Sequence, residues 1–346
     1  LSCRVRLHQD VIDSFARVWR KAATFWLNWT QPHELHSVLC GARKLGVRLD
    51  SHLKWTLVGK LQRNLIHFRS SELSGTLYAL CSGSNLGLWS LKGEEGIGLK
   101  HTFENALLGP SGAFRFGPEQ IASSIYALGH SGFLVSSEKV RLQLSKRVVL
   151  TASKMSMDRL AKALSGAVAK RDILRPDEIW LESAIPVIVK SMEKFDQEMT
   201  PGSSLFVLEA LASSRMRPGP ILAELCVSSS CGHRFERTLV RAIRAIALLD
   251  LQVSNDLYAA LTRTFTPNLS YLGIEQCVSL IWSLALVSMR TQDTEHWTLF
   301  SIRKSIIRTA NRRILSVLER VPDIRIQKHA SDCLLQLYSL GYVSSE

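Results

Sequence analysis

The chain has 346 residues, and 46% of them are hydrophobic, so it can bury a core and is not disordered by composition. It is longer than one ordinary globular core, which predicts either two domains or one elongated array. Lys and Arg outnumber Asp and Glu by 43 to 30, and the resulting net charge of +13 favours a polyanionic partner. The alternative is a protein that is merely basic.

The cysteines and the apolar runs argue against two further classes of protein. The seven cysteines are odd in number and scattered along a long chain, so we expect no disulfide framework and a reducing compartment. No apolar run reaches the roughly 18 residues that a membrane span needs, so we expect no membrane span.

A short apolar phrase recurs along the chain and usually carries a small residue after a bulky one, as in Tyr126-Ala127-Leu128. The middle residue of each phrase is taken as its anchor, where a small side chain lets a neighbouring helix approach closely. In chain order the anchors are Gly41, Ala79, Ala127, Ala167, Ala210, Ala245, Ser283 and Gln336. Successive anchors lie 35 to 53 residues apart, and a period near 40 is typical of paired-helix repeats.

A second amphipathic segment follows many of these phrases, which predicts helical hairpins. Examples are residues 51–65, 177–195 and 296–318. The last contains an apolar stripe at four-residue spacing, formed by Ile302, Ile306, Ala310, Ile314 and Leu318. Pro186 should kink or shorten its helix, because proline lacks the N–H for an interior helical hydrogen bond. The best strand signal, residues 146–152, falls where a second helix is due.

Residues 82–117 interrupt this rhythm and contain eight of the 20 glycines. We expect a loop insertion there, with a short helix near 99–108. The stretch "GEEGIG" (93–98) is interpreted as a surface loop, because it lacks the strand-then-helix setting and the Lys-Ser/Thr ending of a phosphate-binding loop.

Together these patterns predict an all-α fold. More specifically, they predict an α-solenoid of about eight helical-hairpin repeats that runs as a single array through residues 1–346, in which each repeat covers its neighbour's apolar face.

Five stretches share a pattern close to "ALxxLG", most of them with an aromatic nearby. They are "LCGARKLG" (39–46), "LYALCSG" (77–83), "IYALGHSG" (125–132), "IWSLALVSM" (281–289) and "LQLYSLG" (335–341). This pattern resembles the octotricopeptide and heptatricopeptide repeat proteins, and the helical part of the proteins related to Fas-activated serine/threonine kinase. The resemblance implies RNA work in a mitochondrion or, alternatively, a plastid, where such proteins can become structural parts of a ribosome. No RAP domain is visible, so a RAP-linked nuclease role is not expected.

Clusters of basic residues predict where RNA would bind. The first cluster has spacings of three and four residues, which place its guanidiniums on one helix face, and the second lies opposite the Ile302–Leu318 stripe. The candidate RNA-binding residues are Arg234, Arg237, Arg241, Arg244, Arg303, Lys304, Arg308, Arg312, Arg313, Arg17, Arg20 and Lys21. Because no regular polar positions are evident in the first helices, we expect recognition of RNA backbone and shape rather than one base per repeat.

Other residues that could carry chemistry are interpreted structurally. Trp19, Phe25, Trp26 and Trp29 are expected to pack or to dock on a protein, and Tyr78, Tyr126 and Trp282 to pack between repeats. Neither "CVSSSCGH" (226–233) nor "HELH" (33–36) has the spacing of a zinc site. We therefore expect no metal, no cofactor and no catalysis.

The sequence thus predicts a non-catalytic RNA-binding or scaffolding protein of an organelle, with the mitochondrial ribosome as the favoured assembly and RNA and neighbouring proteins as partners. The alternative is an armadillo- or HEAT-like scaffold whose basic faces bind acidic proteins. A third class is an enzyme subunit with a helical body.

Overall fold

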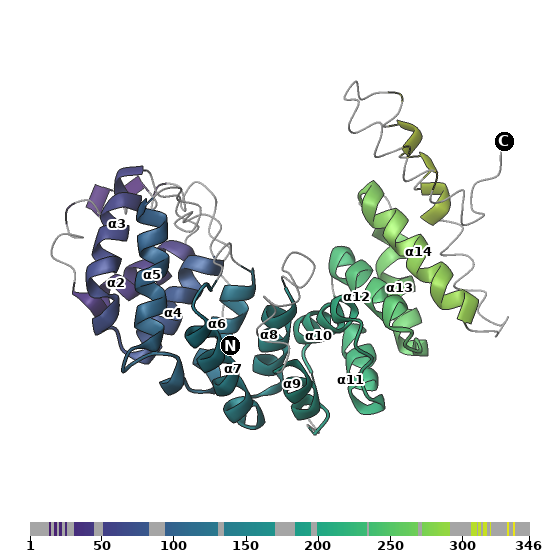
Figure 1. Cartoon of the computed structure of the whole chain (residues 1–346). Helices are drawn as coiled ribbons and strands as arrows, with labels where there is room; N and C mark the ends of the chain where they lie inside the picture. The colour runs from purple at the N-terminus through teal and green to yellow at the C-terminus, as the bar shows by residue number, and fades with distance from the viewer. Residues whose placement is uncertain are drawn as a thin grey trace. The chain divides into compact units, whose positions relative to one another are not determined.

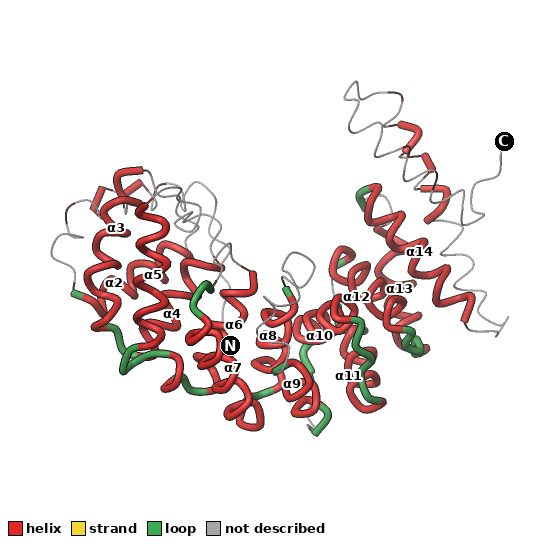
Figure 2. Tube along the Cα trace, viewed as in Figure 1, coloured by secondary structure: helices red, strands yellow, loops and turns green. Residues whose placement is uncertain are grey.

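The structure is a computed structural model of the chain. It describes residues 31–44, 51–82, 94–130, 135–169, 184–194, 199–233, 235–268 and 272–290, and isolated helical positions between 14 and 25 and between 306 and 335. The described residues form helices joined by turns and contain no strand, which confirms the all-α class (Figure 2). The packing divides the chain into two compact units, residues 1–192 and 193–346.

The first unit is built from helices that alternate between two layers (Figure 1). Its α-helices are α2 (Pro32–Lys44), α3 (Ser51–Asn64), α4 (Ser70–Ser82), α5 (Glu94–Leu108), α6 (Pro118–His130), α7 (Glu138–Thr151), α8 (Met157–Val168) and α9 (Ile185–Met192). Short 3-10 turns η1 (Leu65–His67), η2 (Ala113–Arg115) and η3 (Ala152–Lys154) follow α3, α5 and α7. The even-numbered helices pack on one another in the order α2, α4, α6, α8, and the odd-numbered helices in the order α3, α5, α7, α9.

The second unit repeats this arrangement. Its helices are α10 (Pro201–Ser214), α11 (Pro220–Ser230), α12 (Glu236–Leu249), α13 (Asn255–Asn268) and α14 (Ile274–Arg290). Helix α12 packs between α10 and α14, while α11 contacts α13. Arg215 after α10 and Asp250 after α12 adopt left-handed conformations, with φ of 54° and 59°, and so end their helices at equivalent places.

One carboxylate or amide cap recurs at the start of the even-numbered helices. Glu34, Glu72, Gln120 and Gln276 each accept a hydrogen bond from the backbone N–H three residues earlier, at 2.6 to 3.1 Å. These bonds satisfy backbone donors that a helix cannot satisfy itself. Each capping residue lies seven positions before an anchor, so the cap belongs to the repeated sequence pattern.

Two glycines allow the close packing of α6 on α8. A Cβ on Gly166 would collide with the backbone of Ile125 and Tyr126, and a Cβ on Gly129 would collide with the backbone of Gly166. The anchors Ala127 and Ala167 are buried in the same helices. The small residues therefore act as expected here, although the glycines beside the anchors set the helix separation.

A buried carboxylate ties α5 to the start of α7. Glu104 is 4% exposed and accepts hydrogen bonds from the backbone N–H of Ser136 at 2.5 Å and of Ser137 at 3.2 Å. The Ser136 hydroxyl lies 2.9 and 2.8 Å from its two oxygens. A negative charge at a helix N-terminus is stabilised by the helix dipole, so Glu104 holds two odd-numbered helices together.

Most sequence-based expectations for individual segments hold within the described residues. The first seven anchors lie in α2, α4, α6, α8, α10, α12 and α14, whose starts are 35 to 48 residues apart, and the eighth lies outside the described residues. Residues 146–151 are helical, in α7. Helix α9 has only eight residues and carries Pro186 in its first turn, as a shortened helix should.

The interpretation of "GEEGIG" as a loop is wrong in part. Helix α5 begins at Glu94 and therefore includes Gly96 and Gly98. A Cβ on Gly98 would lie 2.8 Å from the side-chain nitrogen of Gln62. A larger residue at position 98 would therefore require the Gln62 side chain to move.

Candidate nucleic-acid interface

In each unit, a stripe of mostly non-core side chains runs along the outward side of the even-numbered helices, and buried residues interrupt it on α8. It occupies the positions eight, four and one residues before each anchor, and we call it the outer stripe. In the second unit it comprises Gly202, Phe206 and Glu209 on α10, Arg237, Arg241 and Arg244 on α12, and Glu275, Ser279 and Trp282 on α14. All nine are exposed or half-buried, because the spacing of seven residues keeps them on one side of each helix.

The arginines of α12 form the basic centre of this stripe. Arg241 makes a bidentate ion pair across to α10, with its Nε and Nη2 each 2.6 Å from a carboxylate oxygen of Glu209. Arg237 and Arg244 are exposed, and neither forms an ion pair with any described residue. Three of the four predicted arginines thus lie exposed on α12, and the middle one of these three is already engaged by the chain's own carboxylate.

Aromatic side chains flank the α12 arginines on both sides. Phe206 of α10 and Trp282 of α14 are half-buried, and both helices pack against α12. Arginine binds phosphate and aromatic rings stack on bases, so this order of side chains suits a single-stranded nucleic acid.

In the first unit, the outer stripe carries two tyrosines whose rings lie close together, Tyr78 on α4 and Tyr126 on α6. The Tyr78 and Tyr126 rings lie 6.2 Å apart between centroids, tilted by 41°, and Tyr126 lies 4.5 Å from the ring of His130. The Arg43 guanidinium stands 4.4 Å from the centre of the Tyr78 ring. The predicted packing between repeats is present for Tyr78 and Tyr126, and both side chains are half-buried.

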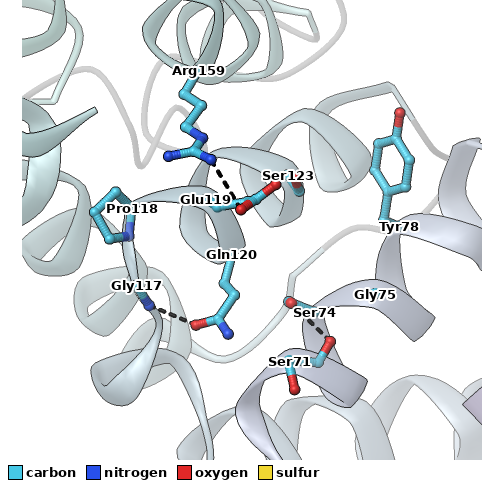
Figure 3. Close-up of a pocket in the computed structure, with 10 residues that line it drawn as sticks. All are labelled: Ser71, Ser74, Gly75, Tyr78, Gly117, Pro118, Glu119, Gln120, Ser123 and Arg159. Carbon is cyan, nitrogen blue, oxygen red and sulfur yellow. Dashed lines mark hydrogen bonds and ion pairs between the residues drawn. The ribbon is translucent and has the colours of Figure 1, made fainter. Parts of the chain in front are cut away.

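A cleft opens beside Tyr78 where α4, α6 and α8 begin (Figure 3). It has a volume of about 480 Å³ and is lined by Ser71, Ser74, Gly75, Tyr78, Gly117, Pro118, Glu119, Gln120, Ser123 and Arg159. Arg159 Nη2 lies 2.9 Å from Glu119 Oε2 at its edge. On α8 the outer stripe is interrupted, because Ala163 and Gly166, which occupy two of its three positions there, are buried.

The structure describes only some of the other predicted RNA-binding residues. Arg308 and Arg312 are exposed while Ile306 and Ile314 are fully buried, which agrees with a helix that has one basic and one apolar side. Arg17 and Lys21 are exposed helical positions. The predicted residues Arg234, Arg303, Lys304, Arg313 and Arg20 lie outside the described residues.

The regularity of the outer stripe was missed in the sequence. It becomes visible when the seven anchors are aligned, because the stripe then falls at fixed offsets. The residue types at these offsets change from helix to helix, so the stripe is not the set of regular polar positions that reading one base per repeat would need. Glu209 and the cleft residues were missed as well, since their importance depends on neighbouring helices.

Buried Cys226 and His233, and half-buried His36, pack as structural groups. Burial raises the pKa of Cys226 to about 12, so its thiol stays protonated. Burial and the nearby Arg241 charge lower the pKa of His233, which keeps its ring neutral. Burial also lowers the pKa of His36, against the opposing effect of Glu72; its Nδ1 lies 3.1 Å from the Thr76 hydroxyl. Across the described residues, no group of three or more His, Cys, Asp or Glu could hold a metal ion.

Among the helices that the structure describes, none has both the length and the hydrophobicity that crossing a membrane requires. No protein-family model matches the chain, and no curated protein matches it.

Proposed function

We propose that the chain is a non-catalytic RNA-binding protein that holds single-stranded RNA along the outer stripe of its even-numbered helices. The observation that carries this proposal is the α12 ridge, where exposed Arg237 and Arg244 lie between helices that present Phe206 and Trp282. Phosphates of the RNA would pair with the arginines, and bases would stack on the flanking rings.

The net charge of +13 supports the same function, because basic surface attracts a polyphosphate at long range. We also propose that the two layers of helices continue as one solenoid of about eight hairpin repeats, a fold with a long surface for an extended ligand. Residence in a mitochondrion, within a ribosome or another RNA–protein assembly, is the setting that this function suits.

The test is fluorescence anisotropy of a labelled single-stranded RNA with the full chain. We compare the double variant Arg237→Glu/Arg244→Glu with Lys139→Glu/Lys146→Glu, which reverses the same number of exposed charges on α7. The α12 variant should bind RNA roughly 100-fold more weakly. The slope of its affinity against salt concentration should also fall by the equivalent of about two phosphate contacts. Equal losses in the two variants would mean that charge alone, and not the stripe, binds RNA.

One observation favours the alternative of a protein scaffold. The outward face of α7 exposes Leu142, Val149 and Leu150 at 53, 43 and 67%, and the same helix exposes Lys139 and Lys146. Exposed apolar side chains beside cations suit an acidic protein surface. Treating the native complex with RNase separates the two functions, because a scaffold would keep its protein partners.

A further inference from the structure

The cleft at the starts of α4, α6 and α8 combines an aromatic side with polar groups (Figure 3). Tyr78 stands at one side, held by the Arg43 guanidinium 4.4 Å from its ring centre. Ser71, Ser74 and Ser123 also line it, and the Ser74 hydroxyl donates to the Ser71 carbonyl at 3.2 Å. Gln120 closes the far side, with its oxygen 2.6 Å from the Gly117 N–H, so its amide nitrogen remains as a donor.

The charges of the cleft cancel. Arg159 and Glu119 form the ion pair at its edge, and the lining contains no other charged side chain. A bare anion gains little from such a neutral pair. A planar, uncharged group with donors and acceptors at its edge suits the cleft better, and a nucleobase is such a group.

The ion pair also offers a particular order of hydrogen-bonding groups. Arg159 uses Nη2 toward Glu119 Oε2, at 2.9 Å, which leaves further guanidinium N–H donors beside two carboxylate oxygens that can still accept. Read from Arg159 to Glu119, the ion pair therefore offers an N–H donor followed by carboxylate oxygens that accept. Guanine carries the complement along its pairing edge, with the O6 acceptor followed by the N1–H and N2 amino donors. Adenine, cytosine and uracil do not present two adjacent donors there.

We propose that the cleft binds one unpaired guanine base beside Tyr78, with N1–H and the N2 amino group donating to Glu119 and Arg159 donating to O6. This inference rests on the proposed RNA-binding function and deepens it by naming the base preferred in the first unit. Phosphate contacts to the arginines of α12 remain independent of sequence.

The test measures binding of oligouridine RNAs of about ten nucleotides that carry guanosine, inosine, adenosine or uridine at one central position. The wild-type chain should bind the guanosine RNA about tenfold more tightly than the uridine RNA. Inosine lacks the N2 amino group, so the affinity for the inosine RNA should lie between the affinities for the guanosine and uridine RNAs. Glu119→Gln should lose the preference for guanosine without weakening the binding of oligouridine, whereas Glu224→Gln on α11, an exposed position outside the cleft, should change neither the preference nor the affinity. Thermal unfolding checks that both variants stay folded.

A second arm titrates free guanosine monophosphate into the wild-type chain and distinguishes a small-molecule site from a base within RNA. Saturable binding that Glu119→Gln removes would support the cleft for either source of guanine. Equal affinity for all four RNAs in the wild-type chain would overturn the guanine site and leave the proposed function standing. Failure to bind any RNA would overturn the proposed function, and failure to bind the nucleotide as well would overturn both.

Discussion

Arg241 of α12 donates two hydrogen bonds of 2.6 Å to the carboxylate of Glu209 on α10. This is the bidentate geometry in which an arginine also binds a phosphate. Arg241 is 56% and Glu209 is 32% exposed on the side-chain scale, so both remain open to an RNA ligand. In the proposed complex, an RNA phosphate competes with Glu209 for Arg241. In that complex the carboxylate would weaken RNA binding while it orients the arginine.

Replacing Glu209 by Ala should strengthen RNA binding. The change frees Arg241 and removes one negative charge from the stripe, so affinity should rise about threefold to tenfold and the salt dependence should steepen by about one phosphate contact. The stability cost should stay below about 1 kcal/mol, because the ion pair is largely exposed. Anisotropy over a salt series checks this, with Glu224→Ala as the control; weaker binding by the Glu209 variant would contradict it.

Gly166→Ala should destabilise the first unit. The added Cβ would collide with the backbone of Ile125 and Tyr126, which cannot yield as a flexible side chain would, so we expect a loss of about 3 kcal/mol in the free energy of unfolding. Gly41→Ala in α2 is the matched control, because nothing lies within 4 Å of its added Cβ. That variant should gain about 0.5–1 kcal/mol. Denaturant unfolding measures both, and equal effects would refute the close packing of α6 on α8.

Glu104→Ala should also destabilise the first unit. The substitution leaves the backbone N–H groups of Ser136 and Ser137 without the carboxylate that accepts their hydrogen bonds. We expect a loss of about 2–4 kcal/mol, because several charge-assisted hydrogen bonds disappear at a buried site. Glu138→Ala, at an exposed carboxylate nearby, should cost less than about 1 kcal/mol. Faster amide exchange at the start of α7 would locate the effect, and its absence would argue against the cap.

Acidification should destabilise the fold through His233 and His36. Burial lowers both pKa values below the ordinary 6.5, so the unfolded chain binds protons that the folded chain does not. The free energy of unfolding is therefore fully retained above about pH 6.5 and falls as the pH drops below it. His233→Gln and His36→Gln should each flatten this dependence between about pH 7.5 and pH 5.5. An unchanged slope in both variants would show that other groups set it.

The helical pattern and its anchors could be predicted from the sequence because they depend on local spacing. Seven anchors fall in even-numbered helices, and Ile306 and Ile314 are buried as the four-residue spacing required. The extent of α5 could not be predicted in this way. Glycines 96 and 98 oppose helix formation by intrinsic preference, and the packing of α5 against α3 outweighs that preference.

The candidate site was predictable only where one helix carries it. The α12 arginines follow from spacing within α12, but their pairing with Glu209 joins residues 32 positions apart. The cleft likewise takes its lining from three helices, so no local motif marks it. The carboxylate and amide caps can be predicted from the sequence, because their residues lie at the same offset from the anchors: Glu34, Glu72, Gln120 and Gln276.

The most direct test of RNA binding along the outer stripe is photo-crosslinking of the full chain to 4-thiouridine RNA, followed by mass spectrometric location of the attached peptides. The crosslinks should fall on α10, α12 and α14 near Phe206, Arg244 and Trp282, and on α4 and α6 near Tyr78 and Tyr126. Crosslinks confined to the odd-numbered helices, or none above the level of a scrambled-charge control protein, would contradict the proposed interface.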